Sequence, residues 1–122
     1  LKPGGFVTCY DWLKGDYDDY SDDMRYWFKM EGLTYALQTL ESYGAVLNDV
    51  GFVDVTIEDA SDWYREEAHR EYSLMSGDLY PLMVERLGQK DADYFVENWR
   101  SMRVVLDKGE MRQGYCRGRR PS

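Results

Sequence analysis

Apolar residues recur along the chain with two different periods, and each period predicts one kind of secondary structure. Short β-prone or alternating runs predict strands over residues 6–10, 52–58 and 110–118. Apolar residues spaced three and four apart predict helices over residues 40–50 and 91–108, and charge, capping and glycine signals predict helices over residues 22–30, 61–76 and 78–87. The order of strand, two helices, strand, three helices and strand predicts an α/β or α+β fold, in which helices cover a small sheet.

Capping residues and glycines set the expected ends of these elements. Thr39 and Ser61 are expected to cap the helices that follow them, because a hydroxyl oxygen accepts a hydrogen bond from a free N–H group of the first turn. The glycines expected to end the helices are Gly32, Gly51, Gly77, Gly88 and Gly109. Residues 11–21 are expected to form a polar loop. No linker or repeat interrupts the pattern, so a single domain over residues 1–122 is predicted.

Charged residues of the second and third predicted strands favour placing these strands side by side. Asp54 and Glu58 lie on the polar face of one strand, and Arg112 and Arg117 lie on the other. Opposite charges across neighbouring strands contribute about 0.2–1 kcal/mol to stability. The sequence therefore predicts that the last strand pairs with the middle one.

Composition excludes several classes of protein. The net charge of -8 disfavours a general nucleic-acid binder, because an acidic surface repels phosphate. No apolar run approaches the about 20 residues that span a membrane, and the first residues do not form a signal peptide. Cys9 and Cys116 lack metal-site spacing and are interpreted as buried, reduced thiols, with a single disulfide as the alternative if their strands are neighbours. These features predict a cytoplasmic protein.

The acidic run and the one histidine do not predict a metal or catalytic centre. Residues 16–23 lack the central glycine and the final glutamate of a calcium-binding loop. His69 lies among Glu66, Glu67 and Arg70, which is typical of a solvated helix face. No catalytic or metal-ligating residue is therefore predicted.

Several segments resemble the C-terminal part of class I S-adenosylmethionine-dependent methyltransferases, and they occur in the same order. They are the Leu1-Lys2-Pro3-Gly4-Gly5 turn, Tyr43 to Val55, Trp99 to Met102, Gly109-Glu110 and Gly114-Tyr115. The last of these are similar to phosphoethanolamine N-methyltransferases and related small-amine methyltransferases. The resemblance implies an α/β fold that is the C-terminal half of a Rossmann-like methyltransferase, with a three-stranded mixed sheet in the family's strand order 5-7-6, covered by helices.

The resemblance also implies that the cofactor-binding half is absent. Family members bind the cofactor with a glycine-rich turn, which precedes the turn at residues 1–5, and this sequence contains no G-x-G-x-x-G motif. The chain also begins without methionine. We therefore expect a fragment whose full-length parent uses S-adenosylmethionine, and we expect the chain alone to bind none. The uncovered edge of the first strand predicts a homodimer, formed through that edge or by domain exchange.

The resemblance places a small-molecule acceptor near the end of the first strand and the helix after it. Aromatic faces and carboxylates stabilise the cation that an amine becomes on methylation. The candidate substrate-binding residues there are Asp11, Trp12, Tyr26, Trp27 and Tyr35. The structural alternative is a capping role for Asp11 and core packing for the aromatic residues.

Recognition of a phosphate on the acceptor needs fixed cations. Leu33 and Met102 stand approximately where the family has an arginine and a lysine, and Met102 belongs to the apolar helical stripe. Arg100 and Arg103 lie close by and are the candidate substitutes. This departure leaves a different small amine, or another acceptor, as an alternative to phosphoethanolamine.

These observations predict a fragment of a methyltransferase that acts on a small amine or phosphobase and is inactive alone. The alternative is a non-enzymatic α/β domain that binds another protein through its apolar sheet edge. The gene sequence preceding Leu1 would discriminate between them, since a glycine-containing strand–turn–helix there favours the enzyme.

Overall fold

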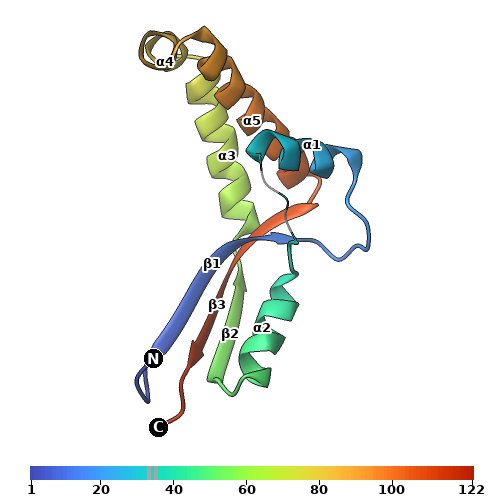
Figure 1. Cartoon of the computed structure of the whole chain (residues 1–122), viewed down its shortest axis with the longest axis vertical. Coiled ribbons are helices and arrows are strands. Elements are labelled where there is room, and N and C mark those ends of the chain that lie inside the picture. The colour runs from blue at the N-terminus through green and yellow to red at the C-terminus, as the bar shows by residue number, and fades with distance from the viewer. Residues whose placement is uncertain (33, 35) are drawn as a thin grey trace.

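Three strands form one sheet, and five helices pack at its end and along one side (Figure 1). The computed structural model describes residues 1–32, 34 and 36–122. The strands are β1 (Phe6–Lys14), β2 (Val53–Asp59) and β3 (Met111–Arg119). The helices are α1 (Asp22–Glu31), α2 (Leu40–Asp49), α3 (Ser61–Ser76), α4 (Tyr80–Leu87) and α5 (Gln89–Asp107). None of the described helices combines the length and apolar character needed to cross a lipid bilayer.

The strands follow one another across the sheet in the order β1-β3-β2, so the C-terminal strand lies in the middle. Both neighbouring pairs are antiparallel. The expectation of a mixed sheet is therefore wrong for these strands, because β3 runs opposite to both β1 and β2. The pairing of the last strand with the middle one is as the charge pattern predicted.

The ion pairs across β2 and β3 are not those expected from the sequence. Arg119 binds Asp54 at 2.7 Å, and Arg112 binds Asp59. The register places Glu58 opposite Tyr115, and it places Arg117 opposite Thr56. Neither of these two charged residues therefore faces an opposite charge directly across the strands. An irregularity between Val53 and Thr56 shifts the pairing, which charge alone could not reveal.

Strand β1 continues to Lys14, so the predicted loop over residues 11–21 begins later than expected. The ladder with β3 extends through Asp11 opposite Gly114 and Leu13 opposite Arg112. Leu13 is buried, whereas Asp11 is exposed. Polar residues are tolerated here because β1 is an edge strand, and their side chains reach solvent.

Two predicted helix caps have different outcomes. Thr39 caps α2, and its hydroxyl accepts a hydrogen bond from the Ser42 N–H at 3.2 Å. Ser61 does not cap α3, because it is the first helical residue and Ala60 stands in the cap position without a side-chain bond. Its hydroxyl oxygen instead accepts from the Gln113 N–H at 3.1 Å, which ties α3 to β3.

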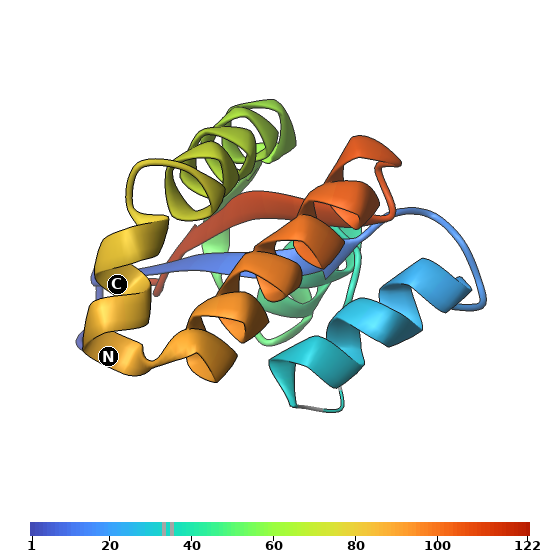
Figure 2. The ribbon, with the colours of Figure 1, turned by 90° about the horizontal axis from the view of Figure 1, so that it is seen from above.

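The main core lies where α1, α3 and α5 meet the end of β3. Its buried members are Met24, Trp27, Ala68, Met102, Val105, Leu106 and Met111. Figure 2 shows α5 lying between α3 and α1, which makes α5 the central helix of this cluster. Helix α2 packs separately against β2 and β3 at the other end of the sheet.

One half of the sheet is bare on the face opposite α2. Tyr10 and Tyr115 stack there with ring centres 4.4 Å apart, and the Arg117 guanidinium lies 4.4 Å from the centre of the Phe6 ring. These three aromatic side chains are exposed. No element of the described chain covers this part of the sheet, so its aromatic residues face solvent.

Candidate functional site

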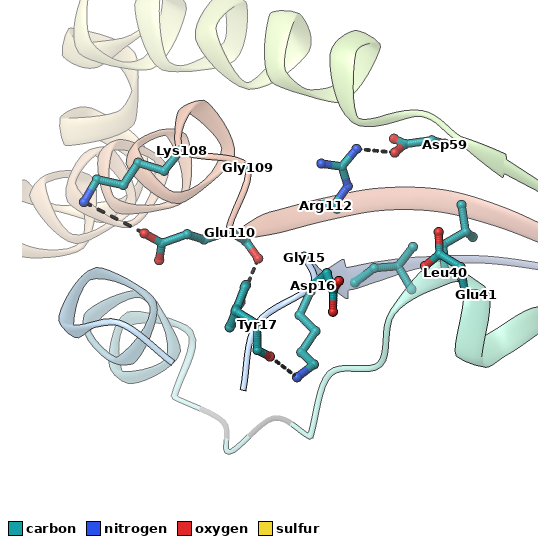
Figure 3. Close-up of a pocket in the computed structure, with 12 residues that line it drawn as sticks. Gly15, Asp16, Tyr17, Leu40, Glu41, Asp59, Lys108, Gly109, Glu110 and Arg112 are labelled. Carbon is teal, nitrogen blue, oxygen red and sulfur yellow. Dashed lines mark hydrogen bonds and ion pairs between the residues drawn. The ribbon is translucent and has the colours of Figure 1, made fainter. Parts of the chain in front are cut away.

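A cleft among the described residues opens where β1 and β2 end and β3 begins (Figure 3). Its volume is about 410 Å³. It is lined by Leu13, Lys14, Gly15, Asp16, Tyr17, Leu40, Glu41, Asp59, Lys108, Gly109, Glu110 and Arg112. Ligands of α/β proteins commonly bind beyond the carboxyl ends of strands, and this cleft lies at that position for β1 and β2.

Two of the cations that line the cleft are neutralised by carboxylates. Arg112 binds Asp59, and Lys108 binds Asp23 and lies 4.0 Å from Glu110. Burial disfavours the ionised form of Asp59, but hydrogen bonds from Ser61 and Arg112 outweigh this effect and lower its pKa. These pairs hold the walls of the cleft together.

Lys14 differs from the other two cations. Its Nζ donates to the Tyr17 carbonyl oxygen at 2.6 Å and lies 5.2 Å from the centre of the Tyr17 ring. The Tyr17 hydroxyl donates to the Glu110 carbonyl oxygen at 2.7 Å, and burial raises the Tyr17 pKa. Lys14 makes no ion pair with a carboxylate of the described residues. It is therefore the cleft cation best placed to attract an anion.

The described residues among those singled out from the sequence lie outside this cleft, in four separate places. Asp11 lies on the side of β1 that faces α2, where its carboxylate accepts from the Tyr43 hydroxyl at 2.5 Å and from the Trp12 N–H at 2.8 Å. The hydrogen bond to Asp11, together with burial, raises the Tyr43 pKa to about 12. Asp11 is thus a strand residue joined to α2.

Trp12 and Trp27 meet at the edge of the core. Their ring centres lie 5.2 Å apart in an edge-on arrangement, and Trp27 is fully buried. The Trp12 indole N–H donates to the Tyr64 hydroxyl at 3.1 Å. The packing alternative therefore describes Trp27 well, while Trp12 is half-buried and its indole N–H bonds to Tyr64.

Tyr26, Arg100 and Arg103 lie on the helices. The Tyr26 hydroxyl and the Arg100 guanidinium both bind Glu97, each at 2.7 Å. Arg103 lies over the ring of Tyr72, 4.0 Å from its centre. Tyr35, the remaining candidate, lies outside the described residues. The structure therefore brings Tyr26 and Arg100 together and keeps Arg103 apart on another side of α5.

Sequence reasoning did not single out the cleft residues Lys14, Asp59, Glu110 and Arg112 as a site. The signal was present, because residues that end strands commonly line ligand sites. It was missed because β1 was expected to stop at Tyr10, which made Asp11 and Trp12 the residues at its end.

Comparison with known proteins relates the chain to one group of enzymes. It is 31% identical to the phosphoethanolamine N-methyltransferase of Triticum aestivum over 114 residues, which are 93% of this chain and 22% of that enzyme. It is 30% identical to phosphoethanolamine N-methyltransferase 1 of Zea mays over the same shares. No protein-family model matches the chain.

A solved structure shows the same fold. Phosphoethanolamine N-methyltransferase 2 of Haemonchus contortus, in complex with phosphomonomethylethanolamine and S-adenosylhomocysteine, superposes with a TM-score of 0.88 at 20% identity. The match covers 100% of this chain and 28% of that protein. The sequence of the chain is thus similar to one part of enzymes named phosphoethanolamine N-methyltransferase, and the solved structure shows the same fold. The chain spans about a fifth of the length of its curated phosphoethanolamine N-methyltransferase relatives.

Among the described residues, the two strands that are followed by helices do not end in a glycine-rich turn of the kind that binds S-adenosylmethionine. A strand–turn–helix that binds such a cofactor needs glycines, so that backbone N–H groups can approach the ligand. Strand β2 passes into α3 through Ala60, and Gly15, which follows β1, is packed against the Gly109 carbonyl oxygen. A Cβ on Gly15 would lie 2.8 Å from that oxygen, so the space that Gly15 leaves is filled by the chain itself.

Proposed function

We propose that this chain is the acceptor-side part of a methyltransferase that transfers a methyl group from S-adenosylmethionine to a small phosphobase. The observation that carries the proposal is the 31% identity to a phosphoethanolamine N-methyltransferase over 93% of the chain. The complex of the Haemonchus contortus relative with phosphomonomethylethanolamine supports this class of acceptor. In this proposal β1, β2 and β3 are the fifth, sixth and seventh strands of the family sheet.

Catalysis of methyl transfer depends more on the positioning of the two reactants than on acid–base chemistry. The amine attacks as a neutral group and leaves as a cation, so a carboxylate and aromatic faces favour the product charge. Asp11 faces α2 and the half-buried Trp12 faces the core, so they are two separate candidates for that role, of which one amine would contact only one. Fully buried Trp27 would act indirectly, by holding the Trp12 ring in place.

The phosphate of the acceptor needs a cation that is not already neutralised. Arg100 is engaged with Glu97, and the Arg103 guanidinium lies over Tyr72. Lys14 makes no carboxylate pair among the described residues and lines the cleft at the end of β1. We therefore add Lys14 to Arg100 and Arg103 in the list of candidate phosphate ligands.

A chimeric enzyme tests the function. The matching segment of the Triticum aestivum enzyme is replaced by this chain, and methylation of phosphomonomethylethanolamine is followed by mass spectrometry. We expect a methylated product, and we expect Lys14→Met to raise KM for the phosphobase more than for S-adenosylmethionine. Lys90→Met, on the far end of α5, is the matched control. A folded chimera that binds S-adenosylmethionine but methylates no small phosphobase would contradict the proposal.

The isolated chain provides a second test. Because the described residues offer no glycine-lined turn to the cofactor, we expect calorimetry with S-adenosylmethionine to show no binding at micromolar concentrations. Micromolar affinity would mean that another part of the chain holds the cofactor, and the proposed division of the enzyme would then be wrong.

A further inference from the structure

Cys9 and Cys116 lie directly opposite each other on neighbouring strands. They are register partners in the antiparallel pair of β1 and β3, and both are free thiols. Residues opposite each other in such a pair place their side chains on the same face, with Cα atoms about 4.5 or 5.5 Å apart. Both distances fall within the range of about 4.4–6.8 Å that protein disulfides span. The backbone therefore already holds the two cysteines at disulfide separation.

The two thiols differ in exposure. Cys116 is 2% exposed on the central strand, whereas Cys9 is half-exposed on the edge strand. A reagent from solution therefore meets Cys9 before the buried Cys116. This is the division of roles between an attacking and a resolving thiol.

The surroundings of Cys116 favour its protonated thiol. Burial and the neighbouring Cys9 raise the pKa of the Cys116 thiol. Ile57 of β2 lies opposite Cys116 on the other side, so Cys116 is enclosed between two strands beneath α2. No other cysteine is present in the chain to compete for either sulfur.

We propose that Cys9 and Cys116 are a reversible redox site, at which glutathione disulfide or a similar small disulfide joins β1 to β3. The Cys9 thiolate attacks one sulfur of glutathione disulfide, forming a mixed disulfide and releasing one glutathione. The Cys116 sulfur then attacks the Cys9 sulfur, loses its proton and releases the second glutathione. Two protein thiols are oxidised, and one glutathione disulfide is reduced to two thiols.

The disulfide would add a covalent link to an edge strand, which is hydrogen-bonded to a neighbouring strand on one side. Among the described residues, β1 pairs only with β3 along its length. The link lies two residues from Asp11, whose carboxylate binds Tyr43 of α2. Oxidation would therefore fix the position of Asp11 and prevent β1 from leaving the sheet. This inference does not depend on the proposed function.

Intact mass spectrometry of the full chain tests the proposal. The reduced protein is equilibrated with excess glutathione disulfide, quenched with iodoacetamide and measured under non-reducing conditions. We expect a monomer that has lost two hydrogen atoms, carries no alkyl group and regains both thiols in dithiothreitol. The Cys116→Ser variant should stop at a glutathione adduct on Cys9, because the resolving thiol is missing.

Thermal unfolding of the oxidised and reduced proteins provides a second readout. The bond joins residues near opposite ends of the chain, so we expect the oxidised protein to melt about 5 °C or more above the reduced protein. Cys9→Ser should show no such difference. Two alkylated thiols after equilibration, a stable glutathione adduct on the wild-type chain, or a disulfide between two copies would each overturn the proposal.

Discussion

Two adjacent aromatic residues of α1 differ in burial: one lies in the core and the other at the surface. Trp27 is fully buried against the ring of Trp12, while Tyr26, one residue earlier, is 40% exposed and binds Glu97. Successive residues of a helix point about 100° apart, so Trp27 points into the core while Tyr26 reaches the surface. The same helix therefore supplies a structural residue and a surface residue side by side.

Replacing Trp27 by alanine should destabilise the protein by about 3–5 kcal/mol, because it leaves a large cavity in the core. Urea denaturation measures this as a lower midpoint with an unchanged slope. Tyr26→Ala is the matched control and should cost far less, since its side chain is exposed. Equal midpoints for the two variants would show that α1 does not pack as described.

Tyr43 should make stability depend on pH in the alkaline range. Its pKa is raised to about 12 by the hydrogen bond to Asp11 and by burial. The folded state therefore holds the proton more tightly than the unfolded state, so this stability is present below the ordinary tyrosine pKa near 10 and is lost as pH rises toward 12.

The Tyr43→Phe variant isolates this contribution. We expect it to be about 1 kcal/mol less stable than wild type at pH 8, a value reduced because the bond is partly solvated. The difference should shrink when urea unfolding is repeated at pH 11. A difference that stays constant between the two pH values would rule out the hydrogen bond as its source.

At the scale of elements, glycines of β3 permit close packing of its neighbours. A Cβ on Gly114 would lie 2.8 Å from the Glu58 carbonyl oxygen of β2 and 3.0 Å from the side chain of Leu40. A Cβ on Gly118 would lie 3.1 Å from the Phe52 Cβ, which is a less severe contact than the 2.8 Å approach to a carbonyl oxygen at Gly114. Gly114 therefore sets how closely β2 and α2 approach the central strand.

We expect Gly114→Ala to destabilise the protein by about 1–3 kcal/mol, because backbone and packed side chains must shift. Gly118→Ala, on the same face of the same strand, should cost less. Thermal unfolding of both variants measures the difference. The account of close packing fails if Gly118→Ala proves the more destabilising change.

At the scale of the whole molecule, the sheet leaves its β1 edge and an aromatic face uncovered by the described residues. Among the residues that the structure describes, the edge receives a backbone partner at Lys14, whose N–H donates to the Gln38 carbonyl oxygen at 3.0 Å. Unpaired strand edges recruit other strands. This supports the prediction of a homodimer formed through β1 or by exchange of that strand.

Sedimentation equilibrium at tens of micromolar should therefore show a dimer. Thr8→Lys places a charge on the β1 edge strand and should shift the protein toward the monomer. Thr56→Lys adds the same charge to β2, at the opposite edge, and serves as the control. A wild-type protein that remains monomeric, or equal effects of both lysines, would contradict association through β1.

The sequence by itself determined most of the elements and the order in which they occur. The Thr39 cap, Gly32 with its positive φ at the end of α1, and the alternation through β2 depend on local backbone chemistry, which neighbouring residues carry. The resemblance to the methyltransferase family was also present in short ordered segments. These features could be predicted because each depends on residues close together in the chain.

Tertiary structure decided the rest, because it depends on residues far apart in the chain. Strand β1 extends to Lys14 only because β3 continues to pair with it, and Ser61 contacts β3 in place of capping its own helix. The charged cleft gathers Lys14, Asp59 and Arg112 from three strands, and the same register sets Cys9 opposite Cys116. No local period encodes such pairings, since register is chosen by the packing of whole strands.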